Sequence, residues 1–329
     1  MHICMVMAGD EEGGLEKHVV ELANGLVQKG HKLTMIAHQK YADRVLNVDF
    51  KAIDLSKSRR NLWVLWQLYT TIKTIKPDVI HVHGNKAAAM VGPLLPYLAV
   101  KAVATLHSRK KNTKMFRNFN AVIAVSPNAA EVLNHPNKFV VLNGIEAPIL
   151  DLSIQKQQPT LVLAVGRLVP VKGFDLLIQA WAGIEDAQLW IVGDGFEKEK
   201  LAALIKTLNL ENTVKLLGHR DDVLQLMQQA SIYAMSSLYE GCPYTMIEAL
   251  LSKVPMLSTA VGAMTMVLPE QYLCPENDVA ALHLLIKKSL LNLEQMNQDF
   301  QTSFDYAQQH LVIEGMLEKI VSIYQQVSQ

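Results

Sequence analysis

The chain has 329 residues, of which half are apolar and 19% are charged. This length suggests about two domains of roughly 150 residues each, and the composition allows a sizeable core and excludes a disordered chain. No apolar run reaches the ~18 residues of a membrane-spanning helix, and the first residues lack the basic and long apolar regions of a signal peptide. Three widely separated cysteines exclude a disulfide framework and fit a reducing compartment, so we expect a cytoplasmic protein.

Charge is unevenly distributed along the chain, although the net charge is zero. Residues 1–146 hold 19 basic and 11 acidic side chains, whereas residues 147–329 hold 12 and 20. A basic first half would attract an anionic acceptor or a membrane surface that carries anionic lipid. Lysines that only keep the protein soluble explain the same excess, and charge alone does not choose between the two interpretations.

The first half alternates short apolar runs with segments of helical spacing. Leu15, Val19, Leu22 and Leu26 recur every three or four residues before Gly30, which predicts a helix over residues 15–29. A second helix is expected over residues 63–75. Short apolar runs predict strands at residues 3–8, 32–37, 79–83, 102–106, 121–125 and 139–142. Such apolar strands, alternating with helices, indicate a parallel sheet covered on both faces.

The alternation stops at residues 146–159, which hold two prolines, a serine and several glutamines, and then restarts. The expected class is therefore α/β, with two doubly wound, Rossmann-like domains. We expect an N-terminal domain over 1–146, a hinge over 147–159, a C-terminal domain over 160–307, and a helix over 308–329 that packs back on the first domain. Ligands of such sheets bind at the carboxyl ends of the strands, which here predicts a cleft between the domains.

Two glycines, Gly13 and Gly14, lie between the first strand and the first helix. Glycines let the backbone approach a ligand, and a helix start offers free N–H groups to a phosphate. The pair does not form the G-x-G-x-x-G pattern of dinucleotide-binding proteins, which disfavours a nicotinamide oxidoreductase. An ordinary strand-to-helix turn explains the pair equally well.

Residues 166–173, Gly-Arg-Leu-Val-Pro-Val-Lys-Gly, follow the first strand of the second half and open a helix. Arg167 and Lys172 place two cations beside that helix start, where they can clamp a diphosphate. The alternative is a solvated loop with two unrelated charges. Because both cations lie at the carboxyl end of a strand, we favour the diphosphate clamp.

Glu240 and Glu248 are separated by seven residues, across a turn and the start of a helix. Gly241 and Pro243 shape a tight loop that presents backbone N–H groups at this helix start. The loop can cradle a phosphate or a sugar while the carboxylates hold hydroxyl groups. An acidic residue early in a helix also stabilises the helix dipole, which is the alternative for Glu248.

Histidines end two strands of the first half. His107 follows the run 102–106, where a neutral imidazole can donate a hydrogen bond to a ligand; the alternative is a core histidine bonded to backbone. His81 and His83 alternate along one strand and so point to the same face. Two histidines without a third ligand make a poor metal site, so we expect them to line an acceptor site without a metal.

A basic segment at residues 108–117 follows His107 directly and holds five cations around Met115 and Phe116. It is suited to an anionic acceptor or to anionic headgroups. A solvated basic loop is the alternative. A second group would extend the same surface: Lys57, Arg59, Arg60, Trp63 and Trp66.

With these motifs in place, the chain resembles glycosyltransferase family 4, whose members have the GT-B fold. The second half carries Gly-Arg-Leu-x-x-x-Lys-Gly at 166–173, Trp-Ile-Val-Gly-Asp-Gly at 190–195, Leu-Gly-His at 217–219 and the Glu-x7-Glu signature. The first half matches at residues 13–19, 77–83, 105–107 and 143–146. The matches cover nearly the whole chain in the family's order, and the Glu-x7-Glu loop is the fairly specific one.

The resemblance implies roles for the matching residues. Glu248 would bind the ribose hydroxyls of a nucleotide sugar, Glu240 would face the transferred sugar, and His107 would lie over that sugar. Arg167 and Lys172 would neutralise the leaving diphosphate, so His107, Glu240, Arg167 and Lys172 are the expected catalytic residues. Further donor contacts would come from Gly14, Gly166, His219, Arg220, Gly241, Cys242, Pro243 and Tyr244. The acceptor would contact His83, Arg109, Lys110 and Lys111.

The family is retaining, which implies a same-face transfer in which the leaving phosphate oxygen takes the acceptor proton. No Asp-x-Asp motif is present, so we expect no cofactor and no metal. The expected donor is a UDP-sugar. The expected acceptor is a glycan or glycolipid of lipopolysaccharide core or capsule. We expect peripheral contact with the anionic inner membrane and no nucleic-acid partner.

Two alternatives stay open. A nucleotide-sugar 2-epimerase has a similar scaffold but would need acid and base carboxylates in the first half, where no clear set is visible. A non-catalytic sugar-nucleotide-binding subunit would keep the fold and lose Arg167, Lys172 or Glu240, all of which are present. The chain departs from the family in its short acceptor half and in Cys242, where phenylalanine is common; the first departure makes the acceptor hard to infer.

Overall fold

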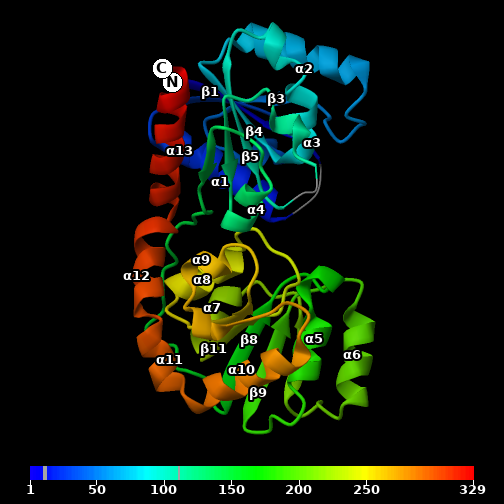
Figure 1. Ribbon diagram of the computed structural model, residues 1–329, viewed down its shortest axis with the longest axis vertical. Coiled ribbons are helices and arrows are strands. Elements are labelled where there is room, and N and C mark those ends of the chain that lie inside the picture. Colours follow the sequence, from blue (N-terminus) through cyan, green and yellow to red (C-terminus); the bar gives the residue numbers. More distant parts are fainter. Residues whose placement is uncertain (10–12, 110–111) are drawn as a thin grey trace. The chain divides into compact units, whose positions relative to one another are not determined.

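The computed structural model describes residues 1–9, 13–109 and 112–329 (Figure 1). The chain divides into two compact units. Unit 1 consists of residues 1–145 and 310–329, and unit 2 consists of residues 146–309. Each unit contains a parallel β-sheet with helices on both faces, so the expected α/β class and the doubly wound arrangement are confirmed.

The sheet of unit 1 has, among the described residues, seven strands in the order β3-β2-β1-β4-β5-β6-β7. The three central strands β1, β4 and β5 are aligned so that Met7 lies beside His83 and His83 beside Thr105. Their carboxyl ends therefore lie at one edge of the sheet. The strands are β1 (His2–Met7), β2 (Lys32–Ala37), β3 (Asp49–Ala52), β4 (Val79–His83), β5 (Lys101–Leu106), β6 (Ala121–Ala124) and β7 (Lys138–Val140).

Helices cover both faces of this sheet, and β1 shows why. Its alternate residues belong to two different cores, with Ile3 and Met5 on one face and Cys4 and Val6 on the other. The first face packs against α1 (Gly14–Gln28) and α13 (Ile313–Ser328). The second face packs against α2 (Leu62–Ile75), α3 (Gly84–Val91) and α4 (Pro127–Glu131).

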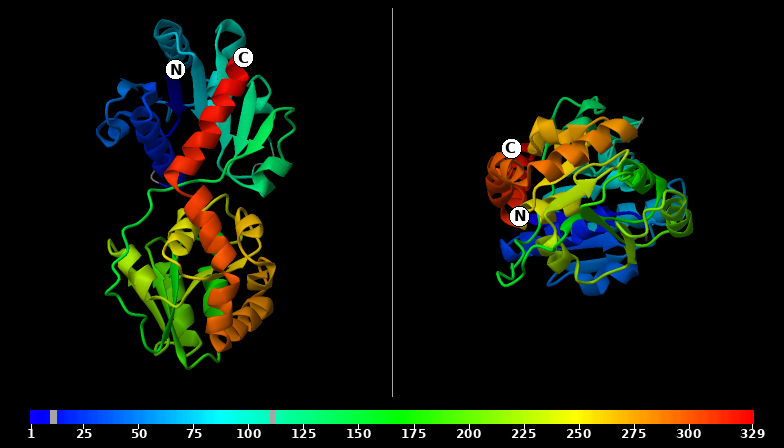
Figure 2. Two further views of the ribbon diagram at one scale, coloured as in Figure 1. Left: turned by 90° about the vertical axis from the view of Figure 1, so that its left-hand side faces the viewer. Right: turned by 90° about the horizontal axis from the view of Figure 1, so that it is seen from below.

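The last helix of the chain, α13, completes unit 1 (Figure 2). It packs closely on α1 because Gly25 has no side chain: a Cβ there would lie 2.6 Å from Leu317 Cδ1. Met316 and Ile320 are also buried in this core. A segment that is distant in sequence therefore supplies part of the wall of the first sheet.

The sheet of unit 2 has, within the described part of the chain, six strands in the order β10-β9-β8-β11-β12-β13. They are β8 (Thr160–Val165), β9 (Ala187–Val192), β10 (Val214–Gly218), β11 (Ile232–Met235), β12 (Met256–Thr259) and β13 (Leu273–Cys274). The helices are α5 (Phe174–Ala180), α6 (Lys198–Thr207), α7 (Val223–Gln229), α8 (Tyr244–Leu251), α9 (Met264–Val267), α10 (Val279–Leu291), α11 (Leu293–Asp299) and α12 (Gln301–His310).

The expected C-terminal helix over residues 308–329 begins later in the structure, because this stretch is divided between α12 and α13, while its expected packing on the first domain agrees with the place of residues 310–329 in unit 1. The backbone of Ile145 interrupts the stretch: the Ile145 N–H donates to the Leu311 carbonyl at 3.0 Å, and the Ile313 N–H donates to the Ile145 carbonyl at 2.8 Å. Gly144 permits this approach, since a Cβ there would lie 2.5 Å from the Val312 carbonyl oxygen.

Short 3-10 turns complete the structure, at Gln39–Arg44, Leu95–Tyr97, Lys114–Phe116, Pro170–Lys172 and Glu270–Tyr272. Residues 146–159, which separate the main part of unit 1 from β8, contain neither helix nor strand. None of the helices in the described ranges combines the length and the apolar character that crossing a membrane requires.

Candidate active site

The loop after β8 brings its cation into contact with a second loop of unit 2. The Lys172 ammonium lies 2.6 Å from Glu240 Oε1, although the two residues are 68 positions apart. The Ser237 hydroxyl donates to the same carboxylate oxygen at 2.8 Å. The Lys172 and Glu240 side chains are only 23% and 12% exposed. Their attraction is therefore screened less than that of a surface pair, and an arriving phosphate would compete with Glu240 for Lys172.

Gly173 makes this arrangement possible. Its φ is 61°, and a Cβ there would lie 2.2 Å from the Ser236 carbonyl oxygen, so the backbone conformation and the close approach both favour glycine. The Ser236 hydroxyl donates to the Lys172 carbonyl at 3.0 Å. The loops that follow β8 and β11 are thus fixed to each other by backbone contacts as well as by the ion pair.

The second loop, residues 240–243, leads into α8. Gly241 accepts a hydrogen bond from the Ala263 N–H at 2.7 Å, and Gly262 lies so close that a Cβ there would be 2.3 Å from the Gly241 carbonyl oxygen. Cys242 and Tyr244 are buried, and Glu248 is half-buried in the second turn of α8. The first backbone N–H groups of a helix have no partner within the helix, so the start of α8 can bind a negatively charged group.

Backbone hydrogen bonds also hold the carboxyl ends of β8, β9 and β10 close together. The Gly166 N–H donates to the Val192 carbonyl at 2.9 Å, and the Gly193 N–H donates to the Gly218 carbonyl at 2.8 Å. Arg167 is exposed beside Gly166. The predicted residues of unit 2 therefore lie along the carboxyl edge of one sheet, where doubly wound folds bind ligands.

His219 and Arg220 lie at the exposed end of this edge. His219 Nε2 is 3.3 Å from Asp221 Oδ1, and the side chains of both residues are well exposed. Arg220 donates to Asp222 through Nε at 2.7 Å and through Nη2 at 2.5 Å. The Arg220 guanidinium therefore already has a carboxylate partner.

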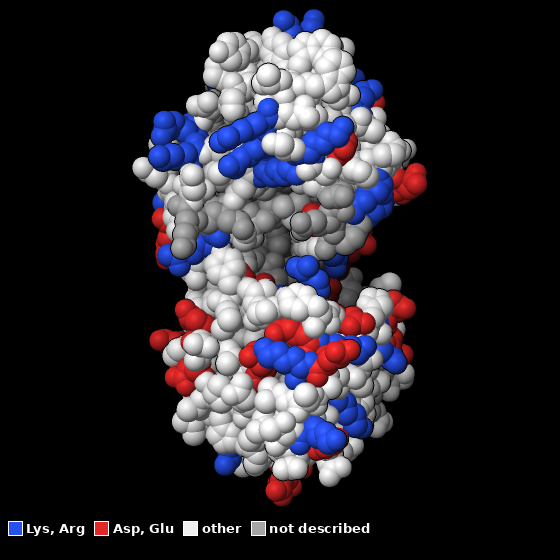
Figure 3. Space-filling model, turned by 90° about the vertical axis from the view of Figure 1, so that its right-hand side faces the viewer, with Lys and Arg blue, Asp and Glu red and all other residues white. Residues whose placement is uncertain are grey.

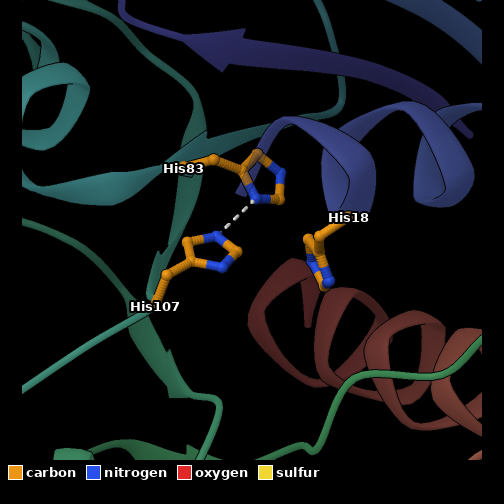
Figure 4. Close-up of side chains that lie close together, drawn as sticks. All are labelled: His18, His83 and His107. Atoms are coloured by element: carbon orange, nitrogen blue, oxygen red, sulfur yellow. Dashed lines mark hydrogen bonds between the residues drawn. The ribbon is translucent and has the colours of Figure 1, made fainter. Parts of the chain in front are cut away.

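In unit 1, three histidines converge (Figure 4). His83 ends β4, His107 follows β5, and His18 comes from the second turn of α1. His83 Nδ1 lies 3.4 Å from His107 Nε2, and the His18 ring centroid lies 4.8 Å from that of His107. His18 was not among the residues predicted from the sequence. The sequence feature that could have indicated His18 is its spacing of four residues from Gly14, because residues four apart lie on the same side of a helix.

Burial keeps these imidazoles neutral. It lowers the pKa of His18 to about 4, and it lowers the pKa values of His83 and His107 well below 6.5, helped by the neighbouring histidines. A neutral imidazole donates from one nitrogen and accepts at the other, or binds a metal.

His81 lies in the core of unit 1 and not in an acceptor site, where it was expected. It is fully buried, and its Nδ1 and Nε2 share hydrogen bonds with the Tyr324 hydroxyl at 2.5 Å and the Thr105 hydroxyl at 2.7 Å. Both of its ring nitrogens are therefore occupied, and the expectation that His81 lines an acceptor site is wrong. The side chain links β4 and β5 to α13.

The remaining predicted residues of unit 1 lie at the surface. Gly14 is exposed as the first residue of α1, and Arg109 is exposed after β5. Lys110 and Lys111 lie outside the described residues. Lys and Arg side chains gather on one face of unit 1 (Figure 3). Trp63 and Trp66, at the start of α2, stack with ring centroids 5.1 Å apart and are 66% and 56% exposed.

A hollow of about 500 Å³ in unit 1 lies away from these residues. Its lining includes His2, Lys32 and Asp49, the first residues of β1, β2 and β3. The hollow is therefore at the amino ends of the strands, opposite to the edge that carries the predicted residues. Its position gives no support to a substrate site there.

Comparison with known proteins assigns both halves of the chain to glycosyltransferases. Residues 12–147 match the family described as Glycosyltransferase Family 4, and residues 152–303 match Glycosyl transferases group 1.

The lipopolysaccharide core biosynthesis glycosyltransferase LpsE of Rhizobium meliloti is 24% identical over 267 residues, which are 76% of each chain. A Campylobacter jejuni relative is 31% identical over 185 residues, which are 56% of this chain and 48% of its own. Its name is N-acetylgalactosamine-N,N'-diacetylbacillosaminyl-diphospho-undecaprenol 4-alpha-N-acetylgalactosaminyltransferase.

The fold agrees with this assignment. The crystal structure of Anabaena HepE in complex with UDP superimposes with a TM-score of 0.84 at 18% identity, over 99% of this chain and 100% of that one. At this identity the likeness concerns the fold, which is GT-B. The two family matches together span nearly the whole chain in the expected order. The chain therefore belongs to the family 4 type of glycosyltransferase and is an enzyme of that class.

Proposed function

We propose that this enzyme transfers a sugar from a UDP-sugar to a glycan or glycolipid acceptor during assembly of bacterial lipopolysaccharide core or capsule, with retention of configuration. The observation that carries the proposal is the contact between Lys172 and Glu240 beside the start of α8. UDP as the nucleotide is supported by its presence in the HepE structure. A lipid-linked or core-glycan acceptor is supported by the names of the two bacterial relatives.

Unit 2 would bind the donor. Lys172 and the exposed Arg167 would neutralise the diphosphate, and the N–H groups at the start of α8 would support the distal phosphate and the sugar. Glu240 would accept hydrogen bonds from sugar hydroxyls, and Glu248 from the ribose. The base would lie near the backbone of His219 and Arg220. The remaining donor contacts, from Gly166, Gly241, Cys242, Pro243 and Tyr244, lie in the same two loops.

Unit 1 would bind the acceptor. His83 and the basic residues Arg109, Lys110 and Lys111 would contact it, and His107 and Gly14 would contact the donor's sugar and phosphate. The exposed Trp63 and Trp66, with the basic face of unit 1, are suited to a peripheral contact with an anionic membrane because aromatic rings and cations both favour the interface.

In the proposed reaction the bond between C1 of the sugar and the diphosphate oxygen breaks, and C1 bonds to the acceptor oxygen on the same face. The leaving phosphate oxygen takes the acceptor proton, so the products are UDP and the glycosylated acceptor. The enzyme would act by positioning the substrates and by stabilising the negative charge on the diphosphate. Lys172 and Arg167 supply positive charge there, so the proposal requires neither a metal at the diphosphate nor another cofactor.

The test incubates the purified protein with UDP-, GDP- and ADP-sugars and measures the free nucleoside diphosphate. Slow release from one UDP-sugar, lost in Lys172→Ala and Glu240→Ala, is the expected result. Lys200→Ala is the matched control, because Lys200 also pairs with a carboxylate, Glu197, at 2.9 Å but lies on α6 and is 62% exposed. Once a glycolipid acceptor is found, the anomeric proton coupling in the product distinguishes retention from inversion.

Two results would contradict the proposal. Conversion of the donor sugar into an epimer without net transfer would indicate an epimerase. Tight nucleotide binding without release, in the presence of lipopolysaccharide-core and undecaprenyl-linked acceptors, would indicate a binding protein.

A further inference from the structure

Glu240, the carboxylate that the proposed function places at the transferred sugar, lies in a loop without regular structure. Residues 236–243 follow β11 and precede α8, and they contain neither helix nor strand. A carboxylate on such a loop needs a fixed support, because the groups of an active site act only when their geometry is closely held. The hydrogen bonds to Glu240 show which residue provides that support.

Two donors among the described residues reach the Glu240 carboxylate, and both use Oε1. Lys172 Nζ lies at 2.6 Å and the Ser237 hydroxyl at 2.8 Å. An ionised carboxylate only accepts hydrogen bonds, so Ser237 is the donor in this contact. Oε2 receives no hydrogen bond from the part of the chain that the structure describes. It is therefore the oxygen that can accept a hydroxyl group of a substrate.

The two donors differ in how firmly they are held. Lys172 carries its ammonium on a flexible four-carbon stem, and its side chain is 23% exposed, so it can turn toward the diphosphate when a donor binds. Ser237 has a short side chain and is only 1% exposed. Its carbonyl accepts a hydrogen bond from the Thr259 hydroxyl at 2.6 Å, which ties it to the end of the neighbouring strand β12. Ser237 is thus the donor that stays in place.

The contact is not explained as a helix cap. The pattern Ser-x-x-Glu is typical of a capping box, in which the serine hydroxyl accepts a hydrogen bond from a backbone N–H at the start of a helix. No helix begins at Ser237, because α8 starts at Tyr244 and its cap residue is Pro243. The Ser237 hydroxyl instead donates to the Glu240 side chain. It therefore orients a functional group and does not stabilise a helix.

We propose that Ser237 is a positioning residue of the transfer reaction: its hydroxyl fixes Glu240 Oε1, so that Oε2 is presented to the transferred sugar. This role rests on the proposed function, because it is the proposed function that places the sugar at Glu240. When the diphosphate attracts Lys172, Oε1 keeps one donor and the carboxylate does not rotate away from the sugar. Ser237 thus lets Lys172 neutralise the diphosphate while Glu240 stays in position.

The test measures release of nucleoside diphosphate from whichever UDP-, GDP- or ADP-sugar the wild type hydrolyses. Ser237→Ala should lower kcat/KM by about 10–100-fold, since the loss of one hydrogen bond to a charged group has about this effect. Ser237→Thr keeps the hydroxyl and should restore most of the activity. Ser303→Ala is the control and should keep wild-type kinetics, because Ser303 is also buried in unit 2 but donates to the Val267 backbone carbonyl at 2.7 Å.

Two further measurements separate positioning from a general loss of structure. The affinity of Ser237→Ala for the free nucleoside diphosphate, measured by calorimetry, should equal that of the wild type, because Ser237 acts on the sugar side of the site. In the Glu240→Gln background, Ser237→Ala should cause little further loss of kcat/KM, because the effects of residues that act through one another are not additive.

Wild-type kinetics in Ser237→Ala would overturn the role of Ser237. An undiminished loss in the Glu240→Gln background, or a matching loss of affinity for the nucleoside diphosphate, would overturn it as well. If Ser237→Thr does not fold, the comparison of the two backgrounds decides the result. A wild type that hydrolyses none of the donors would refute the proposed function, and the role of Ser237 with it. An active wild type with an unaffected Ser237→Ala refutes only the role of Ser237, so the two failures are distinguishable.

Discussion

Lys172 and Glu240 are joined at 2.6 Å between the loops that follow β8 and β11, and Ser237 donates to the same carboxylate. A cation held in this way is ordered before any ligand arrives, and preorganised charges stabilise a transition state without reorganisation during the reaction. The pair therefore makes the two loops one functional element.

Lys172→Ala is expected to lower kcat/KM for the sugar donor by about 10²–10³, the usual effect of removing one preorganised charge-stabilising donor. Most of the loss should appear in kcat, because the charge on the diphosphate grows as the sugar leaves. Steady-state assays of UDP release measure it. Lys200→Ala should keep wild-type kinetics, and an equal loss in both variants would contradict a specific role for Lys172.

Gly173→Ala is expected to destabilise unit 2 by more than the ~1 kcal/mol that a positive φ alone costs an alanine. The new Cβ would meet the Ser236 carbonyl oxygen at 2.2 Å in addition to the φ of 61°. Gly183→Ala is a matched control, because Gly183 has a φ of 80° and nothing within 4 Å of its Cβ position. Urea unfolding of both variants would refute this account if Gly183→Ala were the less stable one.

Stability of unit 1 should fall as the pH drops below about 6.5. The unfolded chain takes up protons on histidines near pKa 6.5, whereas burial holds the pKa of His18 at about 4 and that of His81 at about 3 in the folded chain. Stability is therefore fully present above pH 6.5 and is lost toward pH 4, by up to about 1.4 kcal/mol per pH unit for each such histidine.

Amide hydrogen exchange of the β4 and β5 peptides between pH 7.5 and 5, corrected for the intrinsic exchange rate, would measure this dependence. His18→Gln should reduce the slope by the share of one histidine. A stability that does not change over this range would show that the imidazoles are protonated in the folded chain.

Tyr324→Phe is expected to destabilise unit 1 by about 1–3 kcal/mol, because it leaves His81 Nδ1 buried without its hydroxyl partner. Tyr97→Phe, at a residue that is 75% exposed, should change stability by less than about 0.5 kcal/mol. Urea unfolding followed by exchange of the β4 peptide gives both values. A loss in Tyr97→Phe as large as that in Tyr324→Phe would contradict a specific hydrogen-bond effect.

The sequence predicted the buried strands well, because runs such as 79–83 are apolar and bounded by turn residues. It did not predict β3 or β13. The first has mostly exposed residues and the second has two residues in all, so neither carries a clear hydrophobic pattern. The short helix α3 was missed because Gly84 begins it without a side-chain cap.

The sequence was sufficient to select residues of the candidate site, but it did not show which of them contact one another. Glycines and charged residues after strands mark a carboxyl edge, which is why Arg167, Lys172 and Glu240 could be selected. Their pairing depends on which strands are neighbours, and β8 and β11 are adjacent although β9 and β10 lie between them in sequence. His18 was missed because it lies among apolar residues of α1, where only tertiary packing shows what it faces.

Unit 1 is built from two segments that are separated in sequence by unit 2, with α13 covering part of a sheet whose strands precede residue 141. On a ribosome these strands emerge first, yet one apolar face stays partly uncovered until residues 310–329 have been synthesised. Unit 2 is continuous in sequence and can complete its core earlier. The N-terminal part of the enzyme is thus expected to reach its final structure last, in contrast to the usual order in which domains fold during synthesis.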